Sequence, residues 1–183
     1  RLDRLRKTGK WPTVPVGINL GKSKDTSLDE ASADYLSSFR ALRPFGKYFV
    51  INVSSPNTPG LRELQETHRL REIVHALRRE DPHARLLVKI APDLEDEAAL
   101  EIARLAADEK LAGLIATNTT LDHSALPNHR DQQGGLSGAP LRARATHLLQ
   151  MLCSQSPLPL VASGGVMDKA SAKEKFDAGA SLV

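Results

Sequence analysis

The chain has 183 residues, of which 40% are hydrophobic and 26% are charged, and this composition allows one globular domain with a sizeable core. The formal net charge is only +3 and aromatic residues make up 4%, which gives little support for nucleic-acid binding. The single cysteine excludes an internal disulfide framework and a metal site built from paired cysteines. No apolar run approaches the roughly 20 residues that a membrane-spanning helix needs.

Short β-rich runs alternate with amphipathic helical patterns along the chain, as in repeated βαβ units. The predicted strands are 14–20, 48–51, 86–91, 114–116 and 159–162, and residues 180–183 read as the start of a sixth. Helical spacing of apolar residues predicts helices through 28–42, 70–77, 98–106, 140–153 and 168–179. No interior linker interrupts the pattern, so residues 1–183 are predicted to be one domain or part of one.

Local signals mark several helix ends. Ser27 and Glu30 have the spacing of a capping box for the helix through 28–42. Pro140 stands in the first turn of its helix, where a missing N–H costs little. Cys153 follows an apolar run and is predicted to belong to the core. Asp93 is a candidate cap for the helix whose predicted buried stripe is Ala98, Ile102, Leu105 and Ala106.

Polar residues and glycines follow the predicted strands, at or just past each C-terminal end. They are Asn19, Asn52 with Ser55, Lys89, Thr117 with Asn118, and Ser163 with Gly164 and Gly165. Barrels of the (β/α)8 class build their sites in this way, from many strand ends. A doubly wound sheet would gather its ligand at one switch point and usually carries a Gly-x-Gly-x-x-Gly motif, which this sequence lacks.

We therefore predict an α/β fold of the (β/α)8 TIM-barrel class. The segment holds about five to six βα units of the eight that close a barrel, so the final strands are expected to lie outside it.

The stretch 52–62 joins the end of an apolar strand to a loop rich in amides and hydroxyls. Pro56, Pro59 and Gly60 stiffen and turn this loop, which lowers the cost of holding its polar side chains in a fixed array. Carboxamides suit a small heterocycle with alternating carbonyl and ring N–H groups, and a neighbouring hydroxyl could act on a proton. An isolated stretch of this kind is more often a turn without a ligand, so its neighbours in the sequence decide between the two interpretations.

The predicted loop 119–137 carries two histidines and two aspartates, Asp122, His123, His129 and Asp131. Their spacing matches no metal-ligand pattern, so we predict a solvated loop without a metal ion.

The stretch 52–62, Asn-Val-Ser-Ser-Pro-Asn-Thr-Pro-Gly-Leu-Arg, resembles the substrate loop of the dihydroorotate dehydrogenases. Five further motifs in the same order are similar to motifs of that family: GINLGK at 17–22, VKIAPDL at 88–94, ATNTT at 116–120, GGLSG at 134–138 and ASGGV at 162–166. The serine at position 55 is the form found in the quinone-linked, membrane-associated class, whereas the cytosolic classes carry cysteine there.

The resemblance implies an FMN cofactor and a pyrimidine substrate. It assigns flavin contacts to Asn19, Asn52, Lys89, Thr117, Gly138 and Gly165, and substrate contacts to Asn52, Asn57, Asn118 and Thr119. The two glycines would let the backbone approach the ribityl-phosphate region, which a Cβ would obstruct.

Lys89 lies in an otherwise apolar strand, where a buried cation needs an anionic partner. A reduced flavin would supply one, so Lys89 is expected to stabilise negative charge near N1 and O2 of the ring. The alternative is a salt bridge within the barrel.

The reaction implied by the resemblance is oxidation of (S)-dihydroorotate to orotate, a step of pyrimidine biosynthesis. Ser55 would take the C5 proton while hydride passes from C6 to the flavin N5, and ubiquinone or menaquinone would reoxidise the flavin. A serine hydroxyl is a poor base near neutral pH, so it needs a route for the proton, and Thr58 could supply one through water.

Membrane contact would come from an N-terminal helical extension that this segment lacks. The protein would then be a peripheral protein on the cytoplasmic face of a bacterial inner membrane, or of the mitochondrial inner membrane in a eukaryote. Three alternatives stay open: a cytosolic dihydroorotate dehydrogenase that uses fumarate or NAD, another FMN-barrel oxidoreductase, and a non-catalytic scaffold that binds a phosphate ligand.

Overall fold

The computed structural model describes residues 1–127 and 132–183, and its centre is a parallel sheet. The strands are β1 (Gly17–Leu20), β2 (Tyr48–Asn52), β3 (Leu86–Ile90), β4 (Gly113–Ala116) and β5 (Leu160–Ala162), and their order in the sheet is the order of the chain. A doubly wound sheet would reverse its strand order at a switch point. The sequential order confirms the arrangement expected of a barrel segment.

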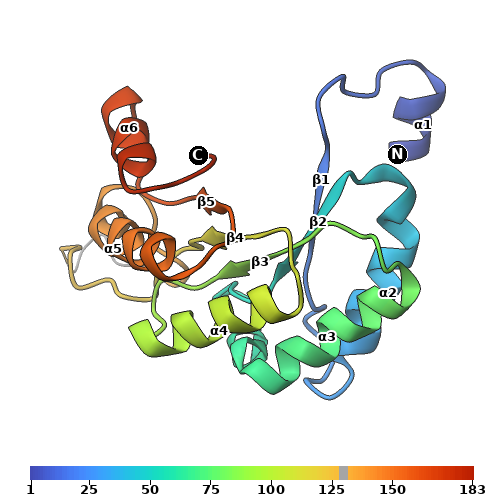
Figure 1. The fold of residues 1–183 in the computed structure, drawn as a ribbon, viewed down its shortest axis with the longest axis horizontal. Coiled ribbons are helices and arrows are strands. Elements are labelled where there is room, and N and C mark those ends of the chain that lie inside the picture. Colours follow the sequence, from blue (N-terminus) through green and yellow to red (C-terminus); the bar gives the residue numbers. More distant parts are fainter. Residues whose placement is uncertain (128–131) are drawn as a thin grey trace.

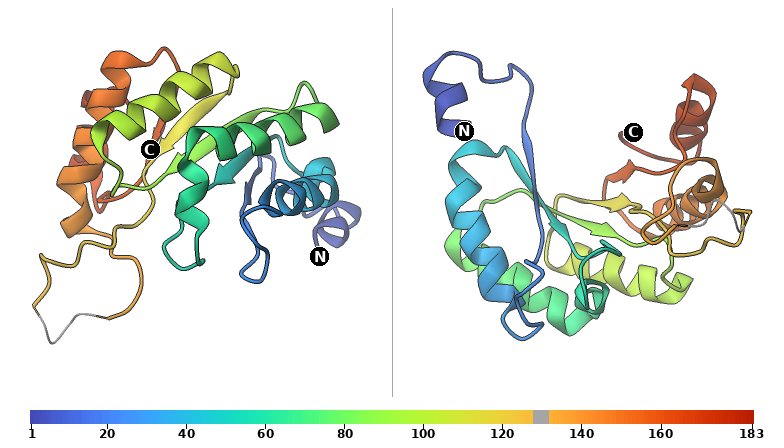
Figure 2. Two further views of the ribbon diagram at one scale, coloured as in Figure 1. Left: turned by 90° about the horizontal axis from the view of Figure 1, so that it is seen from below. Right: turned by 180° about the vertical axis from the view of Figure 1, so that it is seen from behind.

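Helices connect the strands and cover one side of the sheet. They are α2 (Ala31–Leu42), α3 (Thr67–Glu80), α4 (Asp96–Asp108) and α5 (Ala139–Gln155), with α1 (Leu2–Lys7) before β1 and α6 (Lys169–Asp177) after β5. Short 3-10 turns lie at Arg43–Phe45 and Leu61–Gln65. Figures 1 and 2 show α2 to α5 along the convex side of a curved sheet, with both chain ends on the opposite, open side.

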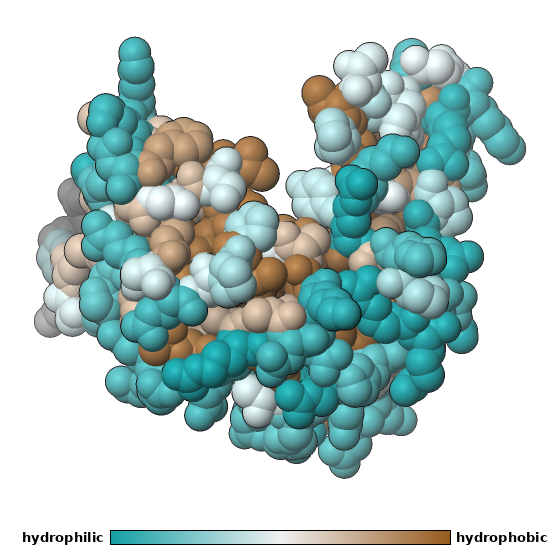
Figure 3. All heavy atoms as spheres, viewed as in Figure 1, coloured by the Kyte–Doolittle hydropathy of each residue, from teal (hydrophilic) through white to brown (hydrophobic). Residues whose placement is uncertain are grey.

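The burial of alternate residues shows that the two faces of the sheet differ. On β3, Leu86, Val88 and Ile90 are fully buried, whereas Leu87 and Lys89 between them are partly exposed. The buried set packs in the main core cluster with apolar residues of the covering helices. The other face borders the hollow that the space-filling view shows between the two arms of the molecule (Figure 3).

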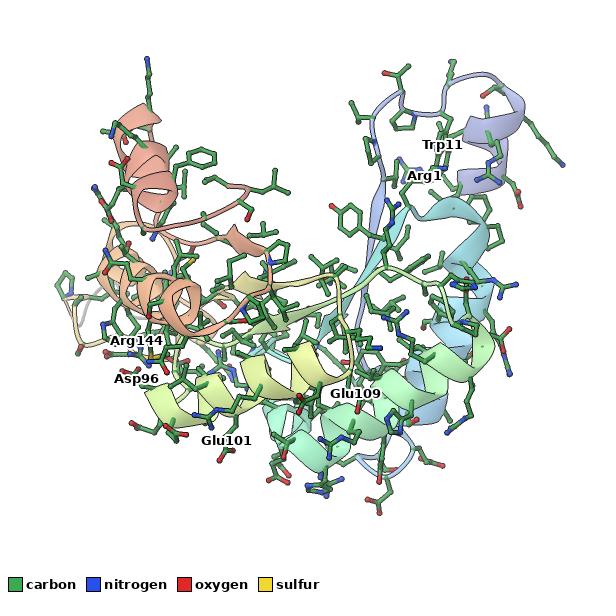
Figure 4. The ribbon with its side chains drawn as sticks, viewed as in Figure 1. Arg1, Trp11, Asp96, Glu101, Glu109 and Arg144 are labelled. Atoms are coloured by element: carbon green, nitrogen blue, oxygen red, sulfur yellow. The ribbon has the colours of Figure 1, made fainter. Side chains whose placement is uncertain are left out.

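Neighbouring helices are tied together by ion pairs at their ends. Where α4 begins beside α5, Arg144 Nη1 lies 2.7 Å from Asp96 Oδ1, and Figure 4 shows the two side chains together. At the other end of α4, the carboxylate of Glu109 lies 3.1 Å from Arg71 Nε and 3.1 Å from His75 Nε2, both on α3. These contacts link α4 to its two neighbours, α3 and α5, in the outer layer.

The last residues pair with β5, as the predicted start of a sixth strand requires. Leu182 forms a parallel bridge with Val161, and the amide of Ala162 donates to the carbonyl of Leu182 at 2.8 Å. The structure therefore holds five strands and the first pairing of a sixth within the described residues.

Two predicted helix starts differ from the observed ones. The helix predicted from residue 28 begins at Ala31; the predicted pair Ser27 and Glu30 does bond, with the Glu30 amide 3.3 Å from Ser27 Oγ, but it lies in the turn before the helix. Asp93 was expected to cap α4 and does not, since α4 begins after Glu95 and the Asp93 carboxylate is occupied elsewhere.

Burial also corrects two predicted core residues. Ala98 is partly exposed, and the neighbouring Ala99 and Leu100 take its place in the buried stripe of α4. Cys153 is only partly buried, although it packs against the core.

Candidate active site

The predicted site residues gather at the carboxyl ends of β2, β3 and β4. Asn52 and Lys89 are direct neighbours in the register of β2 and β3, and Lys89 pairs with Ile115 of β4. Both polar residues are partly buried. Because carboxyl ends of parallel strands share one edge of a sheet, side chains far apart in the sequence come together here.

Asn52, Ser54 and Asn118 form one hydrogen-bonded group. Asn52 Oδ1 accepts from Ser54 Oγ at 2.9 Å, from the Ser54 amide at 3.4 Å and from Asn118 Nδ2 at 3.3 Å. Asn118 Nδ2 also donates to Ser54 Oγ at 3.1 Å, and Asn118 Oδ1 accepts from the Thr119 amide at 2.8 Å. Sequence reasoning gave Ser54 no role, yet it is fully buried and joins the two predicted ligand-binding amides.

The hydrogen bonds of this group determine which end of the Asn52 amide, the oxygen or the nitrogen, remains available to a ligand. A backbone N–H can only donate, so the bond from Ser54 assigns the oxygen of Asn52 to the protein. The Nδ2 donors of Asn52 have no protein acceptor among the described residues. The floor of the site therefore offers amide donors in a fixed orientation.

Ser55 and its neighbours lie on the loop that follows β2. Ser55 is partly exposed, and its Oγ accepts from the Asn57 amide at 3.3 Å. Asn57 is exposed and Thr58 is partly exposed. Within the described residues no hydrogen bond joins Ser55 to Thr58, so a proton route between them would need water, as the sequence interpretation assumed.

Lys89 is a partly buried cation without an anionic partner among the described residues. Burial lowers its pKa, because desolvation disfavours the charged form. The alternative of a salt bridge therefore finds no partner in the described part of the chain, which leaves the ammonium available to an anionic ligand.

A second part of the site is a glycine loop between β5 and α6. The loop borders a pocket of about 360 Å³, whose lining includes Ser137, Gly138, Ser163 and residues 164–166. The amides of residues 164–166 have no protein acceptor among the described residues. Successive free N–H groups in a turn can receive an anion.

The two predicted cofactor glycines serve different purposes. Gly138 has φ +78°, and a Cβ there would meet nothing within 4 Å, so its open side faces the pocket. At Gly165, with φ +71°, a Cβ would lie 2.4 Å from Arg142 Cα, so this glycine is required by the close approach of α5. Packing against α5 therefore requires glycine at Gly165, and the approach of a ligand to this position stays a prediction.

Asn19 and Thr117 complete the predicted cofactor set. Asn19 is exposed at the end of β1 and pairs in register with Val50. Thr117 is buried, its hydroxyl donates to the Asn118 carbonyl at 2.9 Å, and the peptide bond before it is cis. Asn19 is thus open to a ligand, whereas Thr117 shapes the turn that presents Asn118.

Sequence reasoning also missed Arg62, the last residue of the 52–62 stretch. Its side chain bonds to Ser54, Asp93 and Thr119, which belong to three different loops. Its place at the end of the substrate-like stretch was the only sequence signal for this role.

Two of the four loop residues considered as metal ligands, Asp122 and His123, lie among the described residues. His123 Nε2 lies 2.9 Å from the Gly134 carbonyl, and Asp122 caps its own turn by accepting from the Ser124 amide at 2.9 Å. His129 and Asp131 lie outside the described residues. In residues 1–127 and 132–183, no group of three potential metal ligands is found.

Comparison with known proteins identifies the family. The family model described as dihydroorotate dehydrogenase matches residues 2–183. The chain belongs to the dihydroorotate dehydrogenase family. The relatives include a dihydroorotate dehydrogenase (quinone) of Synechococcus elongatus, 52% identical over 197 residues, and one of Gloeobacter violaceus, 50% identical over 182 residues. The matches cover 99% and 98% of this chain, and 52% of each relative.

Solved structures of dihydroorotate dehydrogenases share the fold. The enzyme of Eimeria tenella in complex with ferulenol superposes with a TM-score of 0.89 at 34% identity, and the ligand-free form with 0.86 at 36%. Both matches cover the whole of this chain and 56% and 58% of the Eimeria chains. The chain therefore spans about half the length of the dihydroorotate dehydrogenases it matches.

No helix in the described residues has the length and apolarity needed to cross a bilayer.

Proposed function

We propose that this chain carries the catalytic residues of a quinone-dependent dihydroorotate dehydrogenase, which oxidises (S)-dihydroorotate to orotate in pyrimidine biosynthesis. The observation that carries the proposal is the Asn52–Asn118 amide pair beside the unpaired Lys89 at adjacent strand ends. The quinone class is favoured by the relatives named above and by the serine at position 55.

The residues present fit an FMN cofactor at two places. Lys89 offers an unpaired positive charge to an electron-rich ring, and Asn19 is open to the same hollow. The free amides of residues 164–166, with Gly138 opposite, suit a phosphate group. When bound, the isoalloxazine ring of FMN would supply hydride-accepting chemistry. We propose residues 1–183 as part of one FMN-binding barrel domain.

The polar array fits a pyrimidine. Asn52 Nδ2 retains both of its donors for a ring carbonyl. Asn118 Oδ1 accepts from the Thr119 amide at 2.8 Å and only weakly, at 3.5 Å, from the Thr119 hydroxyl, which a ring N–H would replace. Asn57 reaches the site from the loop after β2, where it is exposed. In this proposal Thr119 and Asn57 complete the substrate contacts.

Ser55 is proposed as the group that takes a proton from the substrate carbon. Its hydroxyl is partly exposed and accepts only one described hydrogen bond, from the Asn57 amide. Thr58 is proposed to pass the proton to solvent through water. Lys89 contributes by offsetting the negative charge that develops in the site as the reaction proceeds.

We propose ubiquinone or menaquinone as the electron acceptor. Because such quinones dissolve in the lipid phase, the enzyme would reach them as a peripheral protein, on the cytoplasmic face of a bacterial inner membrane or on the mitochondrial inner membrane of a eukaryote.

The test uses the protein at its natural length. Purified protein should be yellow, release FMN on denaturation, and bleach when (S)-dihydroorotate is added without oxygen. A short-chain ubiquinone should then restore the flavin spectrum faster than fumarate or NAD. A colourless protein that binds only inorganic phosphate would support a scaffold instead, and reoxidation by fumarate or NAD would indicate a cytosolic class.

A further inference from the structure

The guanidinium of Arg62 joins three loops that leave the sheet side by side. Its Nε donates to the carbonyl of Ser54 at 3.2 Å, its Nη1 to Asp93 Oδ2 at 2.5 Å, and its Nη2 to the carbonyl of Thr119 at 2.8 Å. These acceptors follow β2, β3 and β4 respectively. A planar guanidinium directs its donors in fixed directions, so it can hold three acceptors in one geometry where an ammonium cannot.

The backbone of Arg62 is itself anchored. It lies in the 3-10 turn Leu61–Gln65, whose Leu61 and Leu64 are fully buried. The side chain of Gln65 donates to the Arg62 carbonyl at 3.2 Å and accepts from the Ala91 amide at 2.8 Å. The arginine is therefore fixed to the end of β3, and its side chain is only 21% exposed.

Asp93 extends the same connection to the loop after β4. Its Oδ1 accepts from the hydroxyl of Thr120, and its Oδ2 accepts from the Leu121 amide at 3.0 Å as well as from Arg62. We call Arg62 and Asp93 the loop clamp.

The loop clamp contacts the backbone next to the proposed catalytic and substrate groups. The Ser54 carbonyl belongs to the peptide that continues into Ser55, and the Thr119 carbonyl comes one residue after Asn118. Neither clamp residue lines the glycine pocket or bonds to Lys89. The clamp can therefore set the distance between Ser55 and Asn118 without taking part in cofactor retention.

We infer that Arg62 and Asp93 are positioning residues for the proton-transfer step. They hold the Ser55 loop and the Asn118 loop at the separation that places the substrate carbon against the Ser55 hydroxyl. This inference rests on the proposed function and adds a requirement to it. A displacement of about 1 Å at a reacting centre can cost roughly 100-fold in rate, so loss of the clamp should be visible in the chemical step.

The experiment measures flavin reduction in a single turnover, with unlabelled and C5-deuterated dihydroorotate, in the FMN-loaded protein at its natural length. Arg62→Ala should reduce the flavin roughly 100-fold more slowly and show a larger C5 isotope effect, because cleavage of that bond becomes more rate-limiting. Asp93→Asn should act in the same direction by about 10-fold, since an uncharged amide with one oxygen cannot accept all three hydrogen bonds that the Asp93 carboxylate receives. Guanidinium ion at millimolar concentration should partly restore Arg62→Ala.

A matched control is Arg104→Ala, which removes an exposed arginine paired at 2.8 Å with Glu97 on α4. It should keep the wild-type rate and isotope effect. FMN content per protein should be unchanged in the clamp variants, which a merely structural role would not predict.

Two results would overturn the inference. One is an Arg62→Ala protein that reduces its flavin at the wild-type rate, and the other is a rate loss that merely follows loss of FMN. If Arg62→Ala does not fold, Arg62→Lys and Asp93→Asn decide, because both keep a polar group in place, and a wild-type rate in both would refute the clamp. A wild-type protein that dihydroorotate does not reduce would instead refute the proposed function, and the inference with it.

Discussion

Ser55 and Ser54 are adjacent serines with different surroundings. Ser54 is fully buried and bonded to two asparagines, whereas Ser55 is partly exposed with a single bond from the Asn57 amide. A buried, fully bonded hydroxyl serves structure, and a hydroxyl with spare hydrogen-bonding capacity at the edge of a site is free to act on a substrate.

We predict that Ser55→Ala keeps FMN bound and slows flavin reduction by roughly 100-fold or more, because the missing oxygen is the proposed proton acceptor. Ser54→Ala is the contrasting variant. It should raise the KM for dihydroorotate, since Asn52 and Asn118 lose the hydroxyl that joins them. Stopped-flow absorbance of the flavin measures both, and bleaching of Ser55→Ala at the wild-type rate would remove Ser55 from the mechanism.

Lys89 is a residue whose contributions to function and to stability have opposite signs. Burial lowers its pKa, because the charged form of Lys89 is less stable in the folded protein than in water. A lysine with a depressed folded pKa costs stability at neutral pH, and the cost disappears as the pH rises from that lowered value toward the ordinary lysine value of about 10.4.

We predict that Lys89→Met lowers FMN occupancy and the rate of flavin reduction, yet leaves the melting temperature of the apoprotein equal or higher. The stability difference between variant and wild type should shrink as the pH rises toward the ordinary lysine pKa of about 10.4, and it should vanish above that value, where Lys89 is neutral in both states. Lys47→Met, an exposed position just before β2, is the control and should change neither property. An unchanged FMN content and rate in Lys89→Met would count against a role at the cofactor.

Among the elements, α6 has a cap that is part of the glycine loop. Ser171 is fully buried, and its Oγ accepts from the amides of Met167 and Asp168, both at 2.9 Å, while its own amide donates to Asp168 Oδ1 at 2.7 Å. The free amides of residues 164–166 come directly before this capping box. The start of α6 thus fixes the loop that we propose for the phosphate.

We predict that Ser171→Ala lowers the free energy of unfolding by about 1–3 kcal/mol, because the amides of Met167 and Asp168 lose a buried acceptor. FMN should also dissociate faster from the variant, since the glycine loop loses its anchor. Ser154→Ala removes a hydroxyl of α5 that donates to the Met151 carbonyl at an exposed position, and it should be close to neutral. Denaturant unfolding and flavin fluorescence measure the two effects.

The same cap should respond to acid. Hydrogen bonds from Ser171 hold the pKa of Asp168 below its ordinary value. A carboxylate with a depressed folded pKa stabilises the protein above its unfolded pKa of about 3.9, and this contribution disappears as the pH falls through the lowered value. Part of the acid sensitivity of the wild-type protein should therefore be absent in Ser171→Ala.

At the scale of the whole molecule, the curved sheet is open at both of its edges, β1 and β5. β1 pairs only with β2 among the described residues, and β5 pairs beyond β4 only with the first residues of a sixth strand. The face of the sheet that borders the hollow carries partly exposed apolar residues, among them Leu87, Ile115 and Val161. Open edges and an uncovered apolar face favour association between copies.

We predict that the 183 residues produced on their own neither bind FMN tightly nor oxidise dihydroorotate, and that they aggregate. The amides and side chains of the site would be present, but the walls that exclude water from it would be incomplete. Sedimentation and flavin absorbance test this. A monodisperse yellow protein with a cooperative unfolding transition would show that the sheet needs no further strands.

The sequence alone determined which residues stand at the strand ends and which family motifs they belong to. Alternating apolar runs, prolines and glycines act over a few residues, so the strands, Pro140 in the first turn of α5 and Asp168 before α6 were visible without a structure. Such local patterns failed where the partners of a residue are far away in the sequence. Asp93 was predicted to be a helix cap because its loop precedes α4.

Only the tertiary structure decided what Asp93, Arg62 and Ser54 do. Arg62 reaches Asp93 across 31 positions and Thr119 across 57, and Asn118 reaches Ser54 across 64. Parallel strands in sequence order bring these loops to one edge of the sheet, and no local pattern encodes which side chains then meet. The orientation of the Asn52 amide, the missing partner of Lys89 and the loop clamp are therefore properties of the folded chain.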